Sequence, residues 1–153
     1  MSDTTKRIVK PAQIILDQVR KNANMKEFQL FVAKIRDLCI QFLREGVPLG
    51  TWQIVLTAKL SPELDTLRDE VNSLEGALIA AKLPHERIIL LLKSYVRSLE
   101  GAIEFISLEA MAAPPGTLAF RIERSVKSIL NGNAAVTLDT EYAHEIQEIK
   151  ARL

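Results

Sequence analysis

The sequence predicts an all-α fold: a helical bundle of three long helices with two to four shorter helices and no sheet. Apolar residues recur at steps of three and four along most of the chain, the spacing that places them on one face of a helix. No segment of useful length alternates with the two-residue period of a strand. The 153 residues are 48% apolar and 25% charged, which excludes general disorder and fits one domain.

The N-terminus is expected to be flexible, because residues 1–10 show no apolar period. Pro11 suits the first turn of a helix, where its missing N–H costs nothing, so a short helix is predicted over 11–22. The predicted organisation is a flexible N-terminus, a helical bundle domain, and a linker with a C-terminal helix: residues 1–10, 11–130 and 131–153.

The next helix has the clearest boundaries and should span 25–45. Asn24 and Glu27 have the spacing of a capping box at its start. Its apolar residues cover much of its circumference, which is typical of a central position in a bundle. Gly46 can adopt the left-handed conformation that ends many helices, and Pro48 prevents the helix from resuming.

The middle of the chain should hold two long helices that Pro84 separates. Residues 51–60 fit a short helix or, by propensity, a strand; a lone strand would have no partner, so a helix is favoured. The tripeptide Ser-Pro-Glu at 61–63 then resembles a helix start, with a cap, a proline in the first turn and an acid near the helix dipole. This helix should run over 62–82, and the next over 85–112.

Two shorter helices should complete the chain. The Pro-Pro-Gly sequence at 114–116 stops the long helix, and Thr117 can cap a helix over 118–130. Beyond a turn of small polar residues, Asp139 or Thr140 can start a final helix.

Residues 71–78 and 96–103 agree at six of eight positions, 25 residues apart. Reused helical composition is one explanation. A packing requirement is the other, because a glycine inside a helix costs about 1 kcal/mol relative to alanine. In a hairpin around residue 83, Gly76 and Gly101 would not face each other. Both small surfaces would then be free for a third helix or a second subunit.

No pattern in the sequence predicts an enzyme, a cofactor or a metal site. Glycine-rich phosphate loops and serine elbows are missing. Cys39 lies on an apolar stripe, which indicates a buried, inert thiol. His85 and His144 are far apart, and Glu141 with His144 lacks the second pair that a di-iron bundle site requires. We therefore expect a non-enzymatic protein.

The chain is expected to be cytoplasmic and not inserted in a membrane. A single cysteine cannot form an intrachain disulfide, which fits a reducing compartment. The polar N-terminus is not followed by the apolar core of a signal peptide. The longest apolar run, 88–92, is far shorter than the ~20 residues of a membrane-spanning helix.

Charge is unevenly distributed along the chain. Residues 1–36 hold eight cationic and three acidic side chains, and residues 61–75 hold one cationic and five acidic ones. This pattern fits ordinary solvated charge, internal or intermolecular complementarity, or nucleic-acid contact through the basic parts. The expected basic surface comprises Lys6, Arg7, Lys10, Arg20, Lys21, Arg121, Arg124 and Lys127.

With no site chemistry in the sequence, we expect a protein-interaction or assembly module such as an adaptor, a chaperone or a structural subunit. Each long helix has an apolar face wider than one hairpin can cover, which favours a homodimer. The alternative is that the short helices at 11–22, 51–60 and 118–130 cover these faces within one subunit. Trp52, in a turn-rich stretch, either plugs the core or anchors an interface. The expected partner-binding residues are Gly76, Ile79, Leu91, Gly101 and Trp52. The alternative is a small helical subunit that contacts nucleic acid through the basic N-terminal region and Arg121, Arg124 and Lys127.

Overall fold

The computed structural model of the chain describes residues 3–132 and 138–152, and these residues form helices without a strand. The all-α prediction is confirmed. The helices in chain order are α1 (Asp3–Asn22), α2 (Met25–Glu45), α3 (Trp52–Ala80), α4 (Glu86–Ala112), α5 (Leu118–Leu130) and α7 (Ala143–Arg152). A 3-10 turn precedes α3 and a π-helical turn precedes α7: η1 (Leu49–Thr51) and η2 (Leu138–Tyr142).

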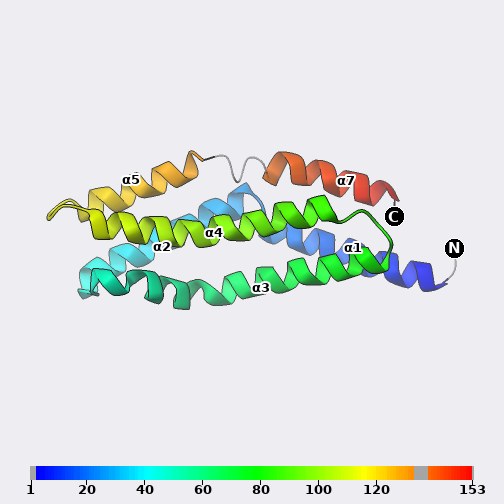
Figure 1. Cartoon of the computed structure of the whole chain (residues 1–153), viewed down its shortest axis with the longest axis horizontal. Coiled ribbons are helices and arrows are strands. Elements are labelled where there is room, and N and C mark those ends of the chain that lie inside the picture. Colours follow the sequence, from blue (N-terminus) through cyan, green and yellow to red (C-terminus); the bar gives the residue numbers. More distant parts are fainter. Residues whose placement is uncertain (1–2, 133–137, 153) are drawn as a thin grey trace.

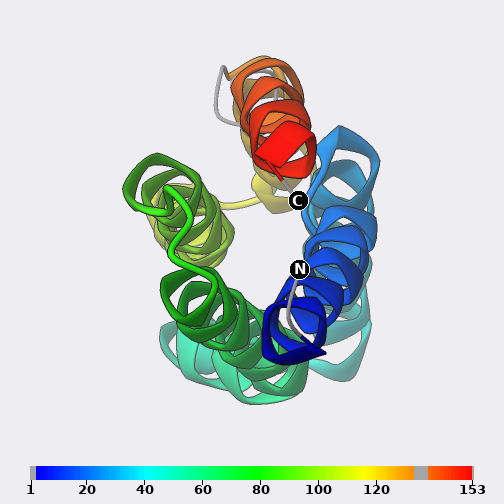
Figure 2. The same ribbon diagram turned by 90° about the vertical axis from the view of Figure 1, so that its right-hand side faces the viewer.

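The helices make an antiparallel bundle of four columns (Figure 1). Helices α3 and α4 each run its whole length, whereas the other two columns each consist of two helices in series, α1 with α2 and α5 with α7. Seen along the bundle, the columns surround a common centre (Figure 2), which one cluster of buried apolar side chains fills. One half of the bundle is therefore built with α1 and α7, and the other with α2 and α5.

Helix α1 begins earlier than the sequence predicts. A flexible segment over 1–10 and a helix start at Pro11 are expected, but the structure has helix from Asp3 onward. A proline near a helix start marks where a helix can begin, not where it must begin. Helix α1 lies along α3, and packing against a neighbour contributes more to helix stability than local signals do.

Helix α3 is one continuous helix, so the predicted start at 61–63 is wrong, whereas the helical interpretation of 51–60 is confirmed. Pro62 cannot donate a hydrogen bond to the carbonyl of Ala58. Both residues are exposed, so water can satisfy that carbonyl. The buried stripe continues across this point: Trp52, Leu56, Leu60, Leu64 and Leu67. Packing of this stripe outweighs the local start signal.

Helix α2 has the boundaries that the sequence predicts. The Asn24 side chain accepts a hydrogen bond from the backbone N–H of Glu27 at 2.9 Å. Its amide group also donates to the carbonyl of Arg20 at 2.8 Å, which fixes the junction between α1 and α2. Gly46 ends the helix with φ of 69°, a conformation that glycine adopts without a steric cost.

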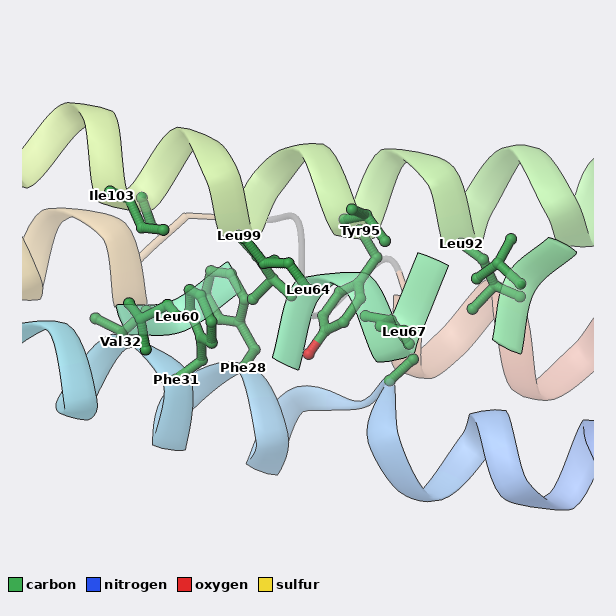
Figure 3. Packing of buried hydrophobic residues seen from close by; sticks show 14 of the residues in the cluster. Phe28, Phe31, Val32, Leu60, Leu64, Leu67, Leu92, Tyr95, Leu99 and Ile103 are labelled. Atoms are coloured by element: carbon green, nitrogen blue, oxygen red, sulfur yellow. The ribbon is translucent and has the colours of Figure 1, made fainter. Parts of the chain in front are cut away.

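The core joins side chains from both full-length helices and from α2. Figure 3 shows this packing for Phe28, Phe31, Val32, Leu60, Leu64, Leu67, Leu92, Tyr95, Leu99 and Ile103. At the α2–α3 loop, Trp52 is only 1% exposed and packs edge-on against Phe42, with ring centroids 5.5 Å apart. Its indole N–H donates to the carbonyl of Val47 at 2.9 Å. This burial matches the core interpretation of Trp52 and leaves no accessible surface for a partner.

The end of α3 contains a strained residue. Lys82 has φ of 58°, and no other described residue besides glycine has a positive φ. The N–H groups of Lys82 and Leu83 donate to the carbonyls of Ile79 and Leu78, both at 3.0 Å. This is the hydrogen-bond pattern of a Schellman motif, in which glycine usually occupies the position of Lys82.

Replacing Lys82 with glycine should raise the free energy of unfolding by up to about 1 kcal/mol. The left-handed conformation costs about 1–2 kcal/mol for other residues, and the added freedom of glycine in the unfolded chain offsets part of that gain. Urea denaturation measures the change. Lys59→Gly, at an exposed position inside α3, is the control and should lower stability by about 1 kcal/mol. Equal losses in both variants would contradict the assignment of strain to Lys82.

Candidate interaction surfaces

The described residues contain no group of three or more His, Cys, Asp and Glu side chains that could hold a metal ion. Cys39 is fully buried, and this burial raises the pKa of its thiol to about 12. The thiol therefore stays protonated at neutral pH, and a protonated, inaccessible thiol is a poor nucleophile. Within the same part of the chain, none of the helices has the length and apolarity to cross a membrane.

The residues expected to bind a partner lie in different environments. Gly76 and Gly101 are exposed, and a Cβ atom at either position would meet no atom within 4 Å. Ile79 is 53% exposed. Leu91 is only half-buried, and the next leucine, Leu90, is the more exposed of the two at 58%. Because residues 90–92 are all leucine, their spacing in the sequence does not show which of them lies on the exposed side of the helix.

The internal repeat gives the α3–α4 pair an approximate two-fold symmetry. Arg68 of α3 lies 2.7 Å from Glu100 of α4, and Lys93 of α4 lies 3.9 Å from Glu75 of α3. Lys93 follows Arg68 by the 25 residues of the repeat, and Glu100 follows Glu75 by the same distance. The two ion pairs are therefore counterparts of each other. A shallow groove of about 240 Å³ lies at these pairs. Its lining residues include Arg68, Glu100 and Lys93 together with two valines.

We call the solvent side of these two helices the α3–α4 face. Exposed apolar side chains lie at both of its ends. Ile79 and Leu90 lie at the end where α3 passes into α4, and the antiparallel register fixed by the ion pairs places them opposite each other. The far end carries Ile54, Leu108 and Met111. Only Ile79 of these five belongs to the expected binding set. For the other four residues, the sequence does contain an indication of exposure, because their positions fall outside the buried stripes of their helices.

The exposed glycines lie between these apolar ends. Gly76 precedes Ile79 by one helical turn, and Gly101 precedes Leu108 by two turns. Because neither glycine is covered within the chain, both leave room for the backbone of another helix to approach. The ion pairs of the repeat lie in the same central part of the α3–α4 face.

A second surface lies between α4 and α5. A groove of about 230 Å³ there is lined by Phe105, Glu109, Arg121, Arg124, Ser125 and Ser128, and we call it the α4–α5 groove. Arg121 forms an ion pair with Glu109 and is partly buried. Arg124 and Lys127 are exposed and make no ion pair with any described residue. The three cations expected on this helix therefore differ: Arg121 is neutralised, whereas the other two have no ion pair among the described residues.

Beside these two cations, Phe120 of α5 is 69% exposed. It precedes Arg124 by four residues, so the two side chains lie on one face of the helix. Phe120 and Phe105 are surface residues that were not predicted from the sequence. The exposure of Phe120 could have been predicted, because its spacing excludes it from the apolar stripe that contains Ile122 and Val126.

The basic N-terminal segment and the acidic segment of α3 meet within the molecule. Lys34 lies 2.7 Å from Glu63, and the amide of Asn22 donates to both carboxylate oxygens of Glu70 at 2.9 Å. These groups are exposed, so each contact contributes little to stability. The uneven charge of the sequence is thus partly compensated inside the chain.

The remaining members of the expected basic surface divide into two groups. Arg20 and Lys21 are exposed at the end of α1, where cations interact favourably with the helix dipole. The side chains of Lys6, Arg7 and Lys10 lie outside the described part of the structure. The described residues therefore do not include a continuous basic surface at this end.

The C-terminal segment, η2 with α7, closes one half of the bundle. Asp139 accepts a hydrogen bond from the backbone N–H of Met25 at 2.9 Å and so helps Asn24 to cap α2. Lys150 lies 2.7 Å from Asp17 of α1. The predicted helix within 131–153 is present here, while residues 133–137 lie outside the described part of the chain.

A hollow of about 410 Å³ beside this segment is lined partly by Arg20, Asn24, Asp139 and Tyr142. Asn24 and Asp139 are engaged as caps of α2, so these polar groups serve the helix junction. Tyr142 is buried, and its hydroxyl has no hydrogen-bond partner among the described residues. Burial accordingly raises the pKa of this phenol well above its usual value.

Replacing Tyr142 with phenylalanine should leave stability unchanged or raise it by about 1 kcal/mol. An unsatisfied buried hydroxyl costs about 1–3 kcal/mol, and phenylalanine retains the ring. Thermal and urea unfolding measure the effect. Tyr142→Ala is the comparison and should lower stability by about 3–5 kcal/mol through loss of the buried ring. A clear loss of stability in the phenylalanine variant would show that the hydroxyl is satisfied in solution.

Comparisons of the chain with protein-family models, with curated proteins and with solved structures gave no match in any of the three searches.

Proposed function

We propose that the protein is a non-enzymatic interaction or assembly module that self-associates through the α3–α4 face. The observation that supports this most is the exposure of apolar side chains at both ends of one face that is charged in its middle. Single-chain proteins seldom leave large apolar patches in contact with water, and a two-fold dimer is the commonest way to cover one.

The α3–α4 face is suited to a second copy of itself. A two-fold axis in the plane of the face and perpendicular to the helices reverses one copy relative to the other. Ile79 and Leu90 of one copy then approach Ile54, Leu108 and Met111 of the other, and this contact occurs twice. Burial of exposed apolar area on association is favourable by roughly 25 cal/mol per Å² before the entropic costs of association.

The middle of the same face is charged and carries both signs, in the Arg68–Glu100 and Lys93–Glu75 pairs. The proposed interface therefore has apolar contacts at its two ends and charged groups at its centre. Charged groups within an interface contribute to register and specificity more than to affinity.

Charged substitutions at the two ends of the face should abolish the dimer. Ile79→Glu and Leu108→Glu each place a carboxylate where an apolar contact is proposed, and burying an unpaired charge is costly. Both positions are exposed, so the helicity of each variant should remain unchanged. Sedimentation velocity measures the oligomeric state, and circular dichroism measures the fold.

Ile14→Glu is the matched control, because Ile14 is equally apolar and exposed but lies on α1. It should retain the dimer. Dimers that persist in both α3–α4 variants would place the interface elsewhere on the molecule. Loss of the dimer in the α1 variant as well would show that a general change of charge, and not this face, controls association.

A further inference from the structure

Four exposed residues of α4 follow one another along a single line on its solvent side. They are separated by steps of seven, four and seven residues, and each such step returns to nearly the same side of a helix with 3.6 residues per turn. The four residues are Leu90, Arg97, Gly101 and Leu108. The order of the steps is the same in both directions along the helix, so the pattern is symmetric about residue 99.

We infer that α4 packs antiparallel on α4 of a second copy along this line, with Arg97 of each copy over Gly101 of the other. This register rests on the self-association through the α3–α4 face proposed above. The two-fold axis of that dimer reverses the direction of α4, so an axis beside residue 99 places Leu90 of one copy against Leu108 of the other. The same axis brings Arg97 to Gly101, and each contact occurs twice.

Gly101 provides the space that this register requires. A Cβ atom at this position would meet no atom within 4 Å, so nothing among the described residues covers the helix there. The long side chain of Arg97 from the second copy can therefore cross the α4 backbone at this point. Glycine lowers the stability of a helix relative to alanine, and this close approach gives a physical reason for a glycine inside α4.

Charge complementarity supports the same register. Arg97 and Glu104 are both exposed, and neither makes an ion pair with another described residue. In the antiparallel register, Glu104 of the second copy lies one helical turn from the glycine that Arg97 covers. Because side chains on a helix lean toward its N-terminus, Arg97 of one copy and Glu104 of the other lean toward each other. The dimer then contains two reciprocal Arg97–Glu104 ion pairs, one on each side of the axis.

Helix α3 indicates the position of the axis independently. Its exposed apolar residues Ile54 and Ile79 have their midpoint between residues 66 and 67. The two ion pairs between α3 and α4 place residues 66 and 67 opposite residues 102 and 101. This point lies within one helical turn of residue 99, so both helices of the face fit the same two-fold axis.

Charge reversal tests the register. Arg97→Glu and Glu104→Arg each replace attraction by repulsion at two symmetric places, so each should raise the dissociation constant of the dimer at least about tenfold. The chain with both substitutions restores opposite charges across the interface, and its constant should return to within about threefold of the original value. Arg124→Glu is the matched control, because it reverses an exposed arginine on α5, and it should leave the constant unchanged. Sedimentation velocity over a dilution series measures the constant, and circular dichroism verifies the helicity.

Gly101→Leu tests the space above the helix. Leucine fills the position that the arginine of the second copy crosses, so the dissociation constant should rise at least about tenfold. The single chain should stay folded, because a Cβ atom at this position meets no other atom within 4 Å and leucine favours a helix more than glycine does. An unchanged dissociation constant would contradict the placement of Arg97 over Gly101.

The outcomes separate this register from the self-association on which it rests. A dimer that Ile79→Glu disrupts, but that both single charge reversals leave intact, overturns the register and retains the α3–α4 face as the interface. Failure of the double variant to recover the affinity that the single variants lose overturns the register in the same way. An unmodified chain that stays monomeric at every concentration overturns the proposed function together with the register.

Discussion

Replacement of Trp52 with alanine should lower the free energy of unfolding by about 3–5 kcal/mol, the range for truncating a large buried aromatic side chain. The indole is enclosed beneath the loop that joins α2 to α3 and packs edge-on against Phe42. Its N–H also satisfies the carbonyl of Val47, which the variant leaves without that donor. Urea denaturation at fixed protein concentration measures the change, since association would make stability depend on concentration.

Two comparison variants separate the contributions of the indole. Trp52→Phe keeps an aromatic ring but removes the hydrogen-bond donor, and its loss should be smaller than that of Trp52→Ala. Gln53→Ala, at an exposed neighbouring position, should change stability by no more than about 0.5 kcal/mol. A loss below about 1 kcal/mol for Trp52→Ala would contradict the placement of this side chain in the core.

Leu74→Ala and Leu99→Ala should each lower stability by about 2–5 kcal/mol. The two leucines are buried at equivalent positions of the internal repeat, one in α3 and one in α4. Each truncation removes apolar contacts and leaves a cavity that long helices cannot readily close. The measurement is the free energy of unfolding from urea or thermal melts.

Ser73→Ala serves as the control for the leucine variants, because Ser73 is adjacent to Leu74 and exposed. Its effect should stay within about 0.5 kcal/mol. If both leucine variants also stayed within that limit, the register of α3 against α4 would be wrong.

Helical periodicity was sufficient to predict most of the core. In α2, the stripe of Phe28, Val32, Ile35, Cys39 and Phe42 is fully buried, and the caps at both ends of the helix follow from Asn24 and Gly46. These features depend on residues within a few turns of each other. Sequence reasoning is strongest at that range, because side-chain spacing and backbone conformation are fixed locally.

Long-range packing determined what the sequence did not predict. The signal at 61–63 is locally a good helix start, yet α3 continues through Pro62 because its buried stripe packs along the bundle on both sides of it. Helices α5 and α7 lie end to end in one column, and this arrangement likewise depends on contacts between distant segments. One such contact joins Asp139 to the start of α2.

Prediction of the surface was also limited because local spacing does not reveal long-range packing. Spacing identified Ile79 as exposed, but it could not separate Leu90 from Leu91, since that depends on which neighbours cover each side of α4. Spacing also placed Arg121, Arg124 and Lys127 on one side of a helix. It could not show that Glu109 of another helix neutralises Arg121, whereas Arg124 and Lys127 have no ion pair within the part of the chain that the structure describes.

The molecular mass of the full chain in solution tests the proposed self-association most directly. Multi-angle light scattering across a tenfold dilution series, at micromolar concentrations, should give twice the chain mass of 17.1 kDa at the upper end and a shift toward one chain mass on dilution. The same series with Ile79→Glu should give the mass of a single chain throughout. A single-chain mass for the unmodified protein at every concentration would contradict the account.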